Sequence, residues 1–221
     1  MKQTIAMAIL CYAVLALKRK RNFAFLAIVF IAGLFHTYAW FFSILFLLTR
    51  KPWQLQTWFI IGGTAIVMLT FNESISKMLE YANAVGKGTA EELVFSGEGM
   101  NVFRVVIYSI VPLTSLSFRK ILEPQMNRKH YILLHMSVIS FMFMLLAAID
   151  GANLFGRMAR YFEFGTIYMF PWIITHLFTK KSQKLMKIAY VGLFSVFALY
   201  QYGDFSDYTG ITLFEFIKTI F

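Results

Sequence analysis

The chain has 221 residues, of which 59% are hydrophobic and 14% are charged, and its mean hydropathy is +0.65. A soluble domain of this length cannot bury so much apolar surface, and several apolar runs reach the roughly 17–25 residues that span a bilayer. The net charge is +10. The basic residues lie between these runs and do not form a basic face on a soluble domain, which argues against nucleic-acid binding. The composition therefore predicts an all-α membrane protein, because a backbone inside hydrocarbon must satisfy its own hydrogen bonds.

The single cysteine and the lack of familiar motifs argue against several kinds of metal, cofactor and catalytic site. Cys11 lies within an apolar run, so the sequence offers no disulfide framework and no cysteine-based metal cluster. It contains no phosphate-binding loop, dinucleotide fingerprint, nucleophile elbow or metal triad. We therefore expect neither a metal nor an organic cofactor.

Seven apolar runs alternate with charged connectors along the chain. The runs are 4–17, 23–48, 53–71, 102–118, 131–149, 162–178 and 188–202. Four connectors hold 14 of the 21 lysine and arginine residues, and their one acidic residue is Glu123. These connectors are 18–21, 50–51, 119–129 and 180–187. By the positive-inside rule, all four are expected on the cytoplasmic side of the membrane.

The run 23–48 has basic connectors at both of its ends, so both ends are expected on the cytoplasmic side. Two short half-helices that form a re-entrant hairpin satisfy this constraint, with Gly33 and His36 near the turn. Half of the run, about 13 residues, reaches roughly 20 Å, which places His36 deep in the membrane and nearer its outer face. The predicted fold is an all-α polytopic transmembrane bundle with about six full spans plus this broken hairpin.

The remaining segments are then expected on the outer side: the N-terminus, the loops 72–101 and 150–161, and the tail 203–221. The loop 72–101 carries five glutamates and two lysines, and its apolar residues recur at helical spacing. We expect it to form a short amphipathic helix on the outer surface. The first run, 4–17, is short for a span and reads like the interior of a longer protein.

Two arginines in the outer stretch "DGANLFGRMARYFEF" depart from the charge rule. Arg157 and Arg160 are three residues apart and share a face if the stretch is helical, as does Tyr161, four residues after Arg157. The planar guanidinium group matches the oxygens of phosphate and pyrophosphate, so we predict an anion-binding site here. The alternative is local pairing, of Arg160 with Glu163 or of Arg157 with Asp150.

Ionisable groups at or inside apolar runs are costly, and each is therefore a functional candidate. Arg104 lies near the start of the run 102–118, at the membrane depth expected for Arg157 and Arg160. The alternative is that its side chain extends to the membrane interface without a functional role. His36 is the most deeply placed ionisable group, and it is either a general base or a histidine satisfied by a neighbouring helix. Asp150 and Glu163 are candidate acid–base groups or partners of the arginines.

Several segments, in this order, resemble the EpsG family of membrane exopolysaccharide polymerases, which are relatives of the Wzy O-antigen polymerases. The opening "KQTIAMAIL" is similar to the Arg-Gln helix of that family, with Gln3 retained and Lys2 in place of the usual arginine. The family's order continues in "AGLFHTYAWFFSILFLLTRK", "NVFRVVIYSIVPLTSLSFRK", "GRMARYFEFGTIYMFP" and the aromatic tail "YQYGDFSDYTGITLFEF". Family members have several helices before the Arg-Gln helix. We therefore expect residues 1–221 to form a single integral membrane domain, the C-terminal part of a longer polymerase.

The resemblance implies glycosyl transfer at the outer face of the bacterial cytoplasmic membrane. The substrate would be oligosaccharide repeat units on undecaprenyl pyrophosphate, and the partners would be the lipid bilayer and other polysaccharide-assembly proteins. The candidate catalytic residues are His36, Arg104, Arg157 and Arg160, and the candidate substrate-binding residues are Lys2, Gln3, Asp150, Tyr161 and Glu163. Three alternatives remain open: a transporter or flippase for lipid-linked glycans, a glycan ligase, and an inactive truncated family member.

Overall fold

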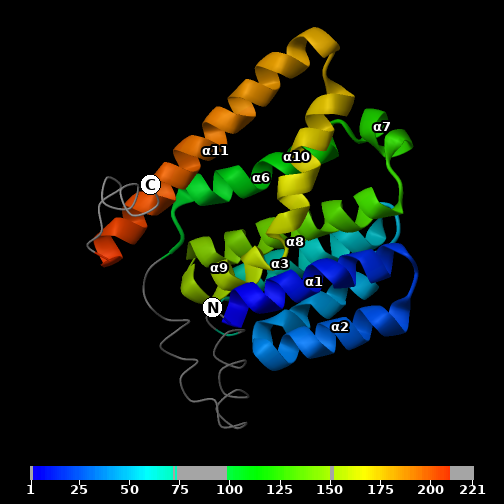
Figure 1. Ribbon diagram of the computed structural model, residues 1–221, viewed down its shortest axis with the longest axis vertical. Coiled ribbons are helices and arrows are strands. Elements are labelled where there is room, and N and C mark those ends of the chain that lie inside the picture. Colours follow the sequence, from blue (N-terminus) through cyan, green and yellow to red (C-terminus); the bar gives the residue numbers. More distant parts are fainter. Residues whose placement is uncertain (1, 72, 74–98, 150–151, 210–221) are drawn as a thin grey trace, which may run out of the picture. The chain divides into compact units, whose positions relative to one another are not determined.

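The computed structural model describes residues 2–71, 73, 99–149 and 152–209 (Figure 1). Every regular element in these ranges is a helix, which confirms the predicted all-α class. In chain order the elements are α1 (Lys2–Lys18), α2 (Asn22–Phe35), the 3-10 helix η1 (Thr37–Phe46), α3 (Leu55–Leu69), α6 (Val102–Ser117), α7 (Arg119–Leu122), the 3-10 turn η2 (Glu123–Gln125), α8 (Arg128–Ile149), α9 (Ala152–Arg160), α10 (Glu163–Leu177) and α11 (Lys180–Thr209).

The chain divides into two compact units, Met1–Ile173 and Ile174–Phe221. All of the candidate site residues belong to the first unit. Asp150 lies outside the described residues, as does most of the predicted outer-surface helix in 72–101.

Helix length supports fewer spans than the sequence predicts. By length and composition, α8 alone among the described helices is long and apolar enough to cross a bilayer, with a mean hydropathy of 2.4. Val102–Ser117 and Arg119–Gln125 qualify as a second span only if they are counted together, and they are bent by 72°. The apolar helices α2, η1 and α3 are shorter. The prediction of about six full spans is therefore not confirmed, because breaks and turns divide or shorten the apolar runs.

Helix α8 is the central helix of the first unit. It packs against α1, α3, α6, α9 and η1, and every residue from Ile132 to Ser140 is buried. Asn127 caps its first turn. The Asn127 Oδ1 accepts from the backbone N–H of Lys129 at 3.0 Å, and the Asn127 N–H donates to Nδ1 of His130 at 3.1 Å. Such a cap satisfies N–H groups that have no partner within the helix.

The long run 23–48 is broken at His36, as predicted. His36 has an extended backbone, with φ of −154°, and separates α2 from η1. The two helices pack against each other, and a Cβ on Gly33 would lie only 2.6 Å from the indole of Trp40. A larger residue than glycine at position 33 would therefore displace the indole of Trp40.

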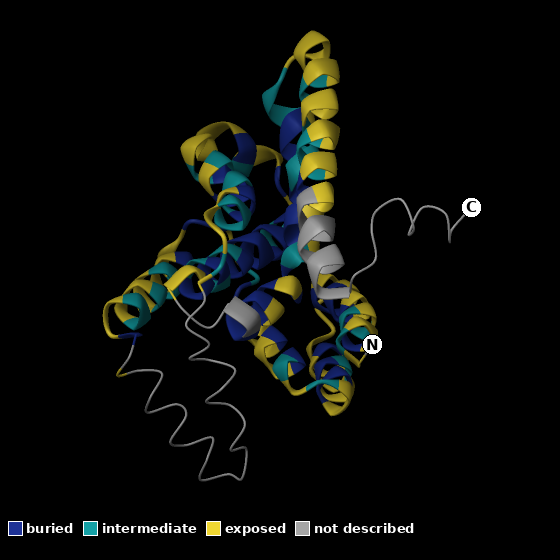
Figure 2. Cartoon of the chain, turned by 90° about the vertical axis from the view of Figure 1, so that its left-hand side faces the viewer, coloured by how far each residue is buried: buried dark blue, intermediate teal, exposed yellow. Residues whose placement is uncertain are grey.

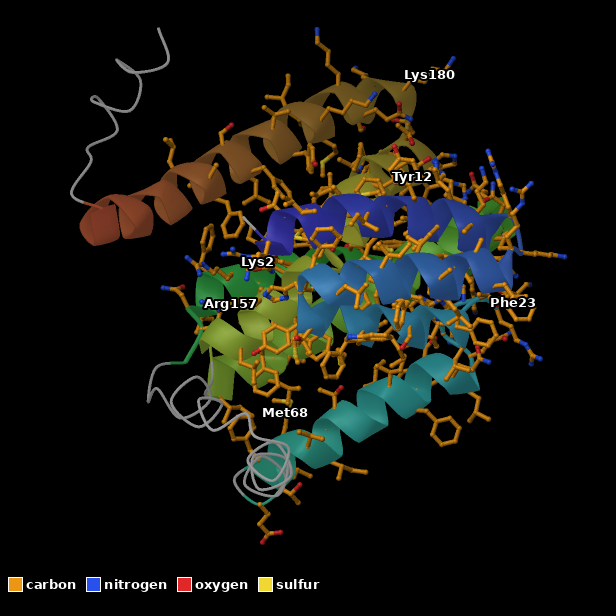
Figure 3. All side chains as sticks on the ribbon, turned by 60° about the horizontal axis from the view of Figure 1, so that its bottom comes forward. Lys2, Tyr12, Phe23, Met68, Arg157 and Lys180 are labelled. Atoms are coloured by element: carbon orange, nitrogen blue, oxygen red, sulfur yellow. The ribbon has the colours of Figure 1, made fainter. Side chains whose placement is uncertain are left out.

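One end of the first unit is basic. Helix α1 ends there and α8 begins there, since Arg128 donates from Nε to the carbonyl oxygen of Leu17 at 3.2 Å. Figure 3 shows nitrogen-bearing side chains gathered near Phe23, at the start of α2, whereas Lys2 and Arg157 lie at the opposite end. Basic connectors that are distant in sequence therefore meet at one end of the fold, which we call the basic end.

Helix α9 folds back along the C-terminal half of α8. The hydroxyl of Ser140 donates to the carbonyl oxygen of Ala159 at 2.8 Å, which fixes the end of α9 beside the middle of α8. Leu154, Phe155 and Met158 are buried in the cluster that joins the two helices. The charge pattern predicts that this segment is part of an outer loop. It forms a packed helix instead, because its apolar residues recur at helical spacing on one face.

The second unit contains the end of α10 and α11. Gln183 donates from Nε2 to the carbonyl oxygens of Thr175 at 3.0 Å and Phe178 at 2.9 Å, which satisfies groups left open at the end of α10. Helix α11 is longer than the predicted run 188–202, because the basic residues from Lys180 onward join it. Most of its described side chains are exposed (Figure 2).

Candidate functional site

The outward face of α9 carries two arginines. Arg157 and Arg160 are exposed, whereas Met158 between them is buried. In the part of the chain that the structure describes, no ion pair within 4.0 Å involves either guanidinium group. The alternative of an Arg160–Glu163 ion pair is therefore not realised at this distance, and the Arg157–Asp150 alternative concerns a residue outside the described ranges. Arg160 acts electrostatically on Glu163 without a direct ion pair.

An aromatic turn after α9 sets the position of Tyr161. Phe162 is fully buried; it stacks on Phe42 of η1, with ring centroids 5.3 Å apart, and packs against Phe143 of α8 at 6.0 Å. Aromatic pairs of this kind contribute about 0.5–1.5 kcal/mol beyond the burial of their area. Tyr161 is consequently held beside the hairpin and is only 4% exposed. It does not extend the arginine face, since α9 ends at Arg160.

His36 and Tyr161 form a hydrogen-bonded pair. The Tyr161 hydroxyl lies 2.7 Å from Nδ1 of His36, and the two ring centroids are 5.9 Å apart. Tyr38 packs edge-on against the imidazole at 5.1 Å. Arg157 is close enough to act on His36 electrostatically. The pair therefore joins the break in the hairpin to the end of α9 and places an imidazole near a guanidinium group.

The first turn of α1 also reaches α9. Gln3 donates from Nε2 to the carbonyl oxygen of Arg157 at 3.1 Å. Carbonyl groups in the last turn of a helix have no partner within that helix, so this hydrogen bond stabilises the end of α9 that bears the arginines. Lys2 precedes Gln3, is exposed, and lies at the same end of the unit as Arg157 (Figure 3). It adds a further positive charge there.

A second group of residues surrounds the first turns of α6 and α10. Tyr108 is 4% exposed, and Glu163 lies close enough to interact with it electrostatically. Arg104 and Arg160 both lie close enough to Tyr108 to interact with it electrostatically. Arg104 also contacts the Sδ of Met100 from Nη1 at 3.4 Å. The structure thus brings three predicted residues, Arg104, Arg160 and Glu163, around one buried tyrosine.

Helix lengths show that several of these groups lie at a similar distance from the basic end of the first unit. Helices α1 and α2 have 17 and 14 residues, so Gln3 and His36 both lie roughly 20 Å from the basic end at 1.5 Å per residue. Ser140, which contacts the end of α9, lies at a similar distance along α8. The arginines are therefore not beyond the end of α8 but beside its middle.

Two residues at this level were not identified from the sequence. Tyr108 is four residues after Arg104 in a helix, and this spacing puts both side chains on one face. That spacing was a usable signal. The sequence contains no signal for Ser140. Its role depends on the carbonyl group of Ala159, which comes within reach because α9 folds back along α8.

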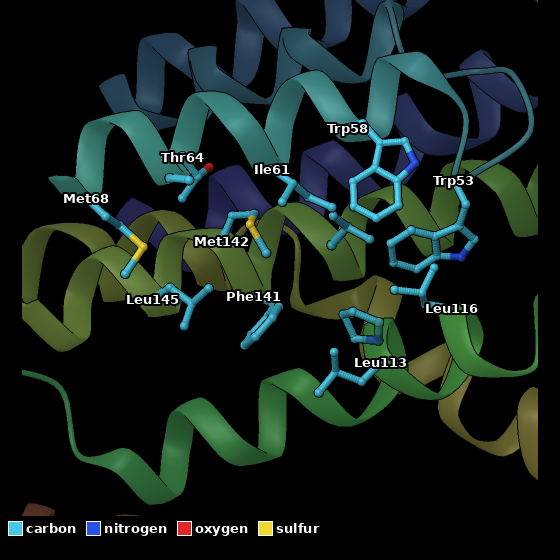
Figure 4. Close-up of a pocket in the computed structure, with 13 residues that line it drawn as sticks. Trp53, Trp58, Ile61, Thr64, Met68, Leu113, Leu116, Phe141, Met142 and Leu145 are labelled. Carbon is cyan, nitrogen blue, oxygen red and sulfur yellow. The ribbon is translucent and has the colours of Figure 1, made fainter.

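One apolar cavity of the first unit is separate from the candidate site. One cavity of about 270 Å³ lies between α3, α6 and α8, with Trp53, Trp58, Met68 and Met142 among its lining residues (Figure 4). None of the candidate site residues lines it. Within the described ranges, no group of three or more His, Cys, Asp or Glu side chains could hold a metal ion. The groups gathered around α9 are guanidinium, imidazole, phenol and carboxyl groups, a combination suited to binding an anion and transferring a proton.

A sequence model of the EpsG family matches residues 1–216, which is nearly the whole chain. No curated protein and no solved structure matches the chain.

Proposed function

The chain belongs to the EpsG family, and on that premise we propose that it polymerises oligosaccharide repeat units carried on undecaprenyl pyrophosphate. The family is one of membrane-associated polysaccharide biosynthesis, with a polymerase-like function in exopolysaccharide formation. The product is an exopolysaccharide, a capsule or an O-antigen. The protein acts as a multi-pass glycosyltransferase of the bacterial cytoplasmic membrane, beside other polysaccharide-assembly proteins.

The reaction is a glycosyl transfer between two lipid-linked glycans. The bond between the anomeric carbon of one glycan and its pyrophosphate breaks, and a hydroxyl oxygen of the second glycan forms the new glycosidic bond. The hydroxyl proton passes to a base, and the lipid pyrophosphate leaves with the bonding electrons. Negative charge therefore develops on the pyrophosphate, where preorganised donors contribute most to the rate.

The guanidinium groups of Arg157 and Arg160, which are both exposed residues, are the observation that carries this proposal. Arginine forms paired hydrogen bonds to phosphate oxygens, and neither side chain is engaged with a carboxylate within 4.0 Å in the described part of the chain. Arg104 lies close to the same group of residues. The three arginines bind the pyrophosphate and stabilise its charge as it leaves. Lys2 and Gln3 support the same site from α1.

His36 is the base that we assign to the acceptor hydroxyl. Its Nδ1 faces the Tyr161 hydroxyl at 2.7 Å. If Nδ1 carries the proton and donates to Tyr161, then Nε2 is left to accept a proton from the sugar. Glu163 is the second candidate for this role, and Tyr161 holds the imidazole in position.

The membrane orientation follows from the basic end. Lysine and arginine connectors remain on the cytoplasmic side, so the level of His36 and the arginines, roughly 20 Å away, falls in the outer half of a hydrocarbon core about 30 Å thick. The hairpin of α2 and η1 enters and leaves on the cytoplasmic side, and α8 crosses the bilayer. The site opens toward the outer leaflet, where the lipid-linked glycans are joined.

Polymer length measures the proposed role directly. In cells that make the polysaccharide, Arg157→Ala and Arg160→Ala are each expected to shorten or abolish the polymer and to accumulate single lipid-linked repeat units. Lysine at either position is expected to restore only part of the length, because it keeps the charge but not the paired donors. Arg50→Ala, at an exposed arginine of the basic end, is the matched control. Normal polymer length in both alanine variants would contradict the proposal.

The break in the hairpin also suits a transporter, since ion and substrate sites often lie where a membrane helix is interrupted. The same assay separates this alternative. A transporter variant retains lipid-linked units on the cytoplasmic side and does not change elongation of units already outside. A ligase variant accumulates finished, lipid-linked polymer. A chain that is inactive shows no change in any of these products when it is deleted.

A further inference from the structure

The apolar cavity between α3, α6 and α8 is large for a packed protein interior. Its volume is about 270 Å³, about nine times the roughly 30 Å³ that one water molecule takes up in the liquid. Voids larger than a water molecule are few in a packed core. Among the described lining residues, only Thr64 and two tryptophans can form hydrogen bonds through their side chains. Because a buried water needs several polar partners, the cavity is suited to a hydrocarbon chain.

The cavity follows the length of α3. Trp58 lies near the start of this helix and Met68 near its end (Figure 4), and the ten residues between these positions rise by about 15 Å. Trp53, two residues after Lys51, lines the cavity at the basic end. The long direction of the cavity therefore runs from the basic end toward the level of the arginines.

The end of the cavity at Met68 lies next to the candidate site. Met68 packs against the cluster in which Phe155 and Met158 of α9 are buried, and α9 is the helix that carries the two arginines. On α6, Pro112 lines the cavity and is eight residues after Arg104, so about 12 Å of helix separates the cavity from that arginine. A lipid whose pyrophosphate lies at the arginines can therefore extend its chain into the cavity.

The cavity also reaches the surface between α3 and α6. Trp58 and Leu113 both line it, and they are 46% and 51% exposed. Ala65, on α3, lines it as well and is exposed. In the proposed orientation this apolar opening faces the hydrocarbon of the bilayer. A lipid chain can thus enter the cavity from the side, without passing through water.

We propose that this cavity binds part of the isoprenoid chain of the lipid whose pyrophosphate lies at the arginines. The inference rests on the proposed function, since it assigns a place to the chain of the same substrate. A chain that moves from the bilayer into the protein gains little from the hydrophobic effect, because both surroundings are apolar. The gain comes from van der Waals contacts with the cavity walls. Met68 and Met142 suit a methyl-branched chain, because their flexible side chains adapt to irregular shapes.

A bulky side chain at the opening of the cavity tests this assignment. Ala65→Trp places an indole there, on a residue that is already exposed. Ile66→Trp is the matched control on the same helix, because Ile66 is 63% exposed and does not belong to the lining of this cavity. The purified full chain in phosphatidylcholine nanodiscs is titrated with two probes by calorimetry. Farnesyl pyrophosphate carries an isoprenoid chain, and inorganic pyrophosphate carries none.

We expect Ala65→Trp to bind farnesyl pyrophosphate about tenfold more weakly than Ile66→Trp does, as for the misfit of a single methylene group in an apolar pocket. Both variants are expected to bind inorganic pyrophosphate like the unmodified protein. Equal binding of farnesyl pyrophosphate by the two variants would overturn the proposal. If Ala65→Trp does not fold, Leu113→Trp fills the same opening from α6 and carries the same expectation.

An acyl chain of a phospholipid is the competing occupant of the cavity. Native mass spectrometry of the purified protein counts the phospholipids that remain bound to each variant. If Ala65→Trp loses a bound phospholipid but binds farnesyl pyrophosphate as tightly as Ile66→Trp, the cavity is a phospholipid site and the proposal is wrong.

The proposed function fails in a different way. If Arg157→Ala and Arg160→Ala bind inorganic pyrophosphate as tightly as the unmodified protein, or if the unmodified protein shows no saturable binding, then the anion site is refuted, and with it the premise of this inference. If the arginine variants lose binding of inorganic pyrophosphate and Ala65→Trp does not weaken binding of farnesyl pyrophosphate, only the chain site is refuted.

Discussion

The hydroxyl of Tyr161 lies 2.7 Å from Nδ1 of His36, although 125 positions separate the two residues in the sequence. The contact exists because the apolar run 23–48 is broken at His36 and α9 folds back along α8. It connects two features that the sequence presents separately, a histidine within an apolar run and an arginine pair outside one. In the proposed reaction, these features are the base and the pyrophosphate site.

The His36–Tyr161 contact predicts that Tyr161→Phe impairs polymerisation. The phenylalanine ring fills the same buried space, but Nδ1 of His36 loses its partner. We expect a rate about fivefold lower, as for loss of one hydrogen bond, and a larger loss in His36→Asn, which removes the proposed base. The measurement is the length distribution of the polymer made by each variant in cells.

Tyr12→Phe is the control for this pair, because Tyr12 is 69% exposed on α1. It is expected to leave the polymer unchanged. If Tyr161→Phe behaves like Tyr12→Phe while His36→Asn is inactive, then His36 acts without the support of Tyr161. If His36→Asn is fully active, His36 is not the base, and Glu163 becomes the first candidate for that role.

The sequence predicted local features of the fold well, and tertiary contacts less well. The break near Gly33 and His36 was predictable, because both ends of the run 23–48 carry basic residues and charge stays on one side of a membrane. The fold-back of α9 was not, since a helix of nine residues gives only a short amphipathic pattern. Its position depends on contacts such as the one from Ser140 to Ala159.

The candidate site shows the same division between local pattern and packing. Charge in an apolar setting identified Arg104, Arg157 and His36 as candidates, because such groups are costly without a function. Tyr108 carries no charge, so in the sequence only its spacing of four residues from Arg104 links it to the site. Its electrostatic interaction with Glu163 depends on the packing of α6 beside the start of α10.

A buried hydrogen-bond chain fixes the start of α3. The backbone N–H of Trp53 donates to Oγ1 of Thr57 at 3.0 Å, and that hydroxyl lies 3.1 Å from Nε2 of His135. The Nδ1 of His135 lies 2.8 Å from the carbonyl oxygen of Tyr131. A carbonyl only accepts, so Nδ1 carries the proton and Nε2 accepts from Thr57. Trp53 has a positive φ of 60°, an uncommon conformation for a residue other than glycine, and this chain holds it.

Thr57→Val is therefore expected to destabilise the protein. Two buried groups lose their partner, the N–H of Trp53 and Nε2 of His135, at about 1–3 kcal/mol each. Thermal unfolding in detergent, followed by circular dichroism, measures the effect. Thr64→Val, at a partly buried threonine that lines the cavity beside α3, is the control and is expected to unfold near the unmodified protein. Equal shifts in the two variants would contradict a special role for the Thr57 hydroxyl.

The crossing of α8 and α10 depends on Gly165. A Cβ at this position would meet the carbonyl oxygen of Leu133 and would lie 2.6 Å from Cβ of Met136. Gly165→Ala is expected to lower the free energy of unfolding by about 1–3 kcal/mol, as for overpacking of a core. Gly62→Ala has no atom within 4 Å of the added methyl group, so we expect the opposite sign, a gain of about 0.5–1 kcal/mol from better helix propensity. Thermal unfolding of both variants checks the contrast, and a Gly165→Ala protein as stable as Gly62→Ala would show that the helices separate freely.

The ion pair at the basic end predicts how stability and the reactivity of Lys51 depend on pH. Lys51 and Glu123 are 3.0 Å apart, and the hydrogen bond to Glu123, followed by its charge, raises the pKa of Lys51 above the ordinary value of 10.5. The stability that the pair contributes is therefore fully present below the pKa of the unfolded lysine and is lost as pH rises through the folded pKa.

Only the neutral amine reacts with an activated ester, so Glu123→Gln is expected to speed labelling of Lys51 at pH 9, measured by mass spectrometry of the labelled peptide. Glu73→Gln removes an exposed carboxylate elsewhere and is the control. Equal labelling rates in the two variants would mean that the pair does not persist in solution.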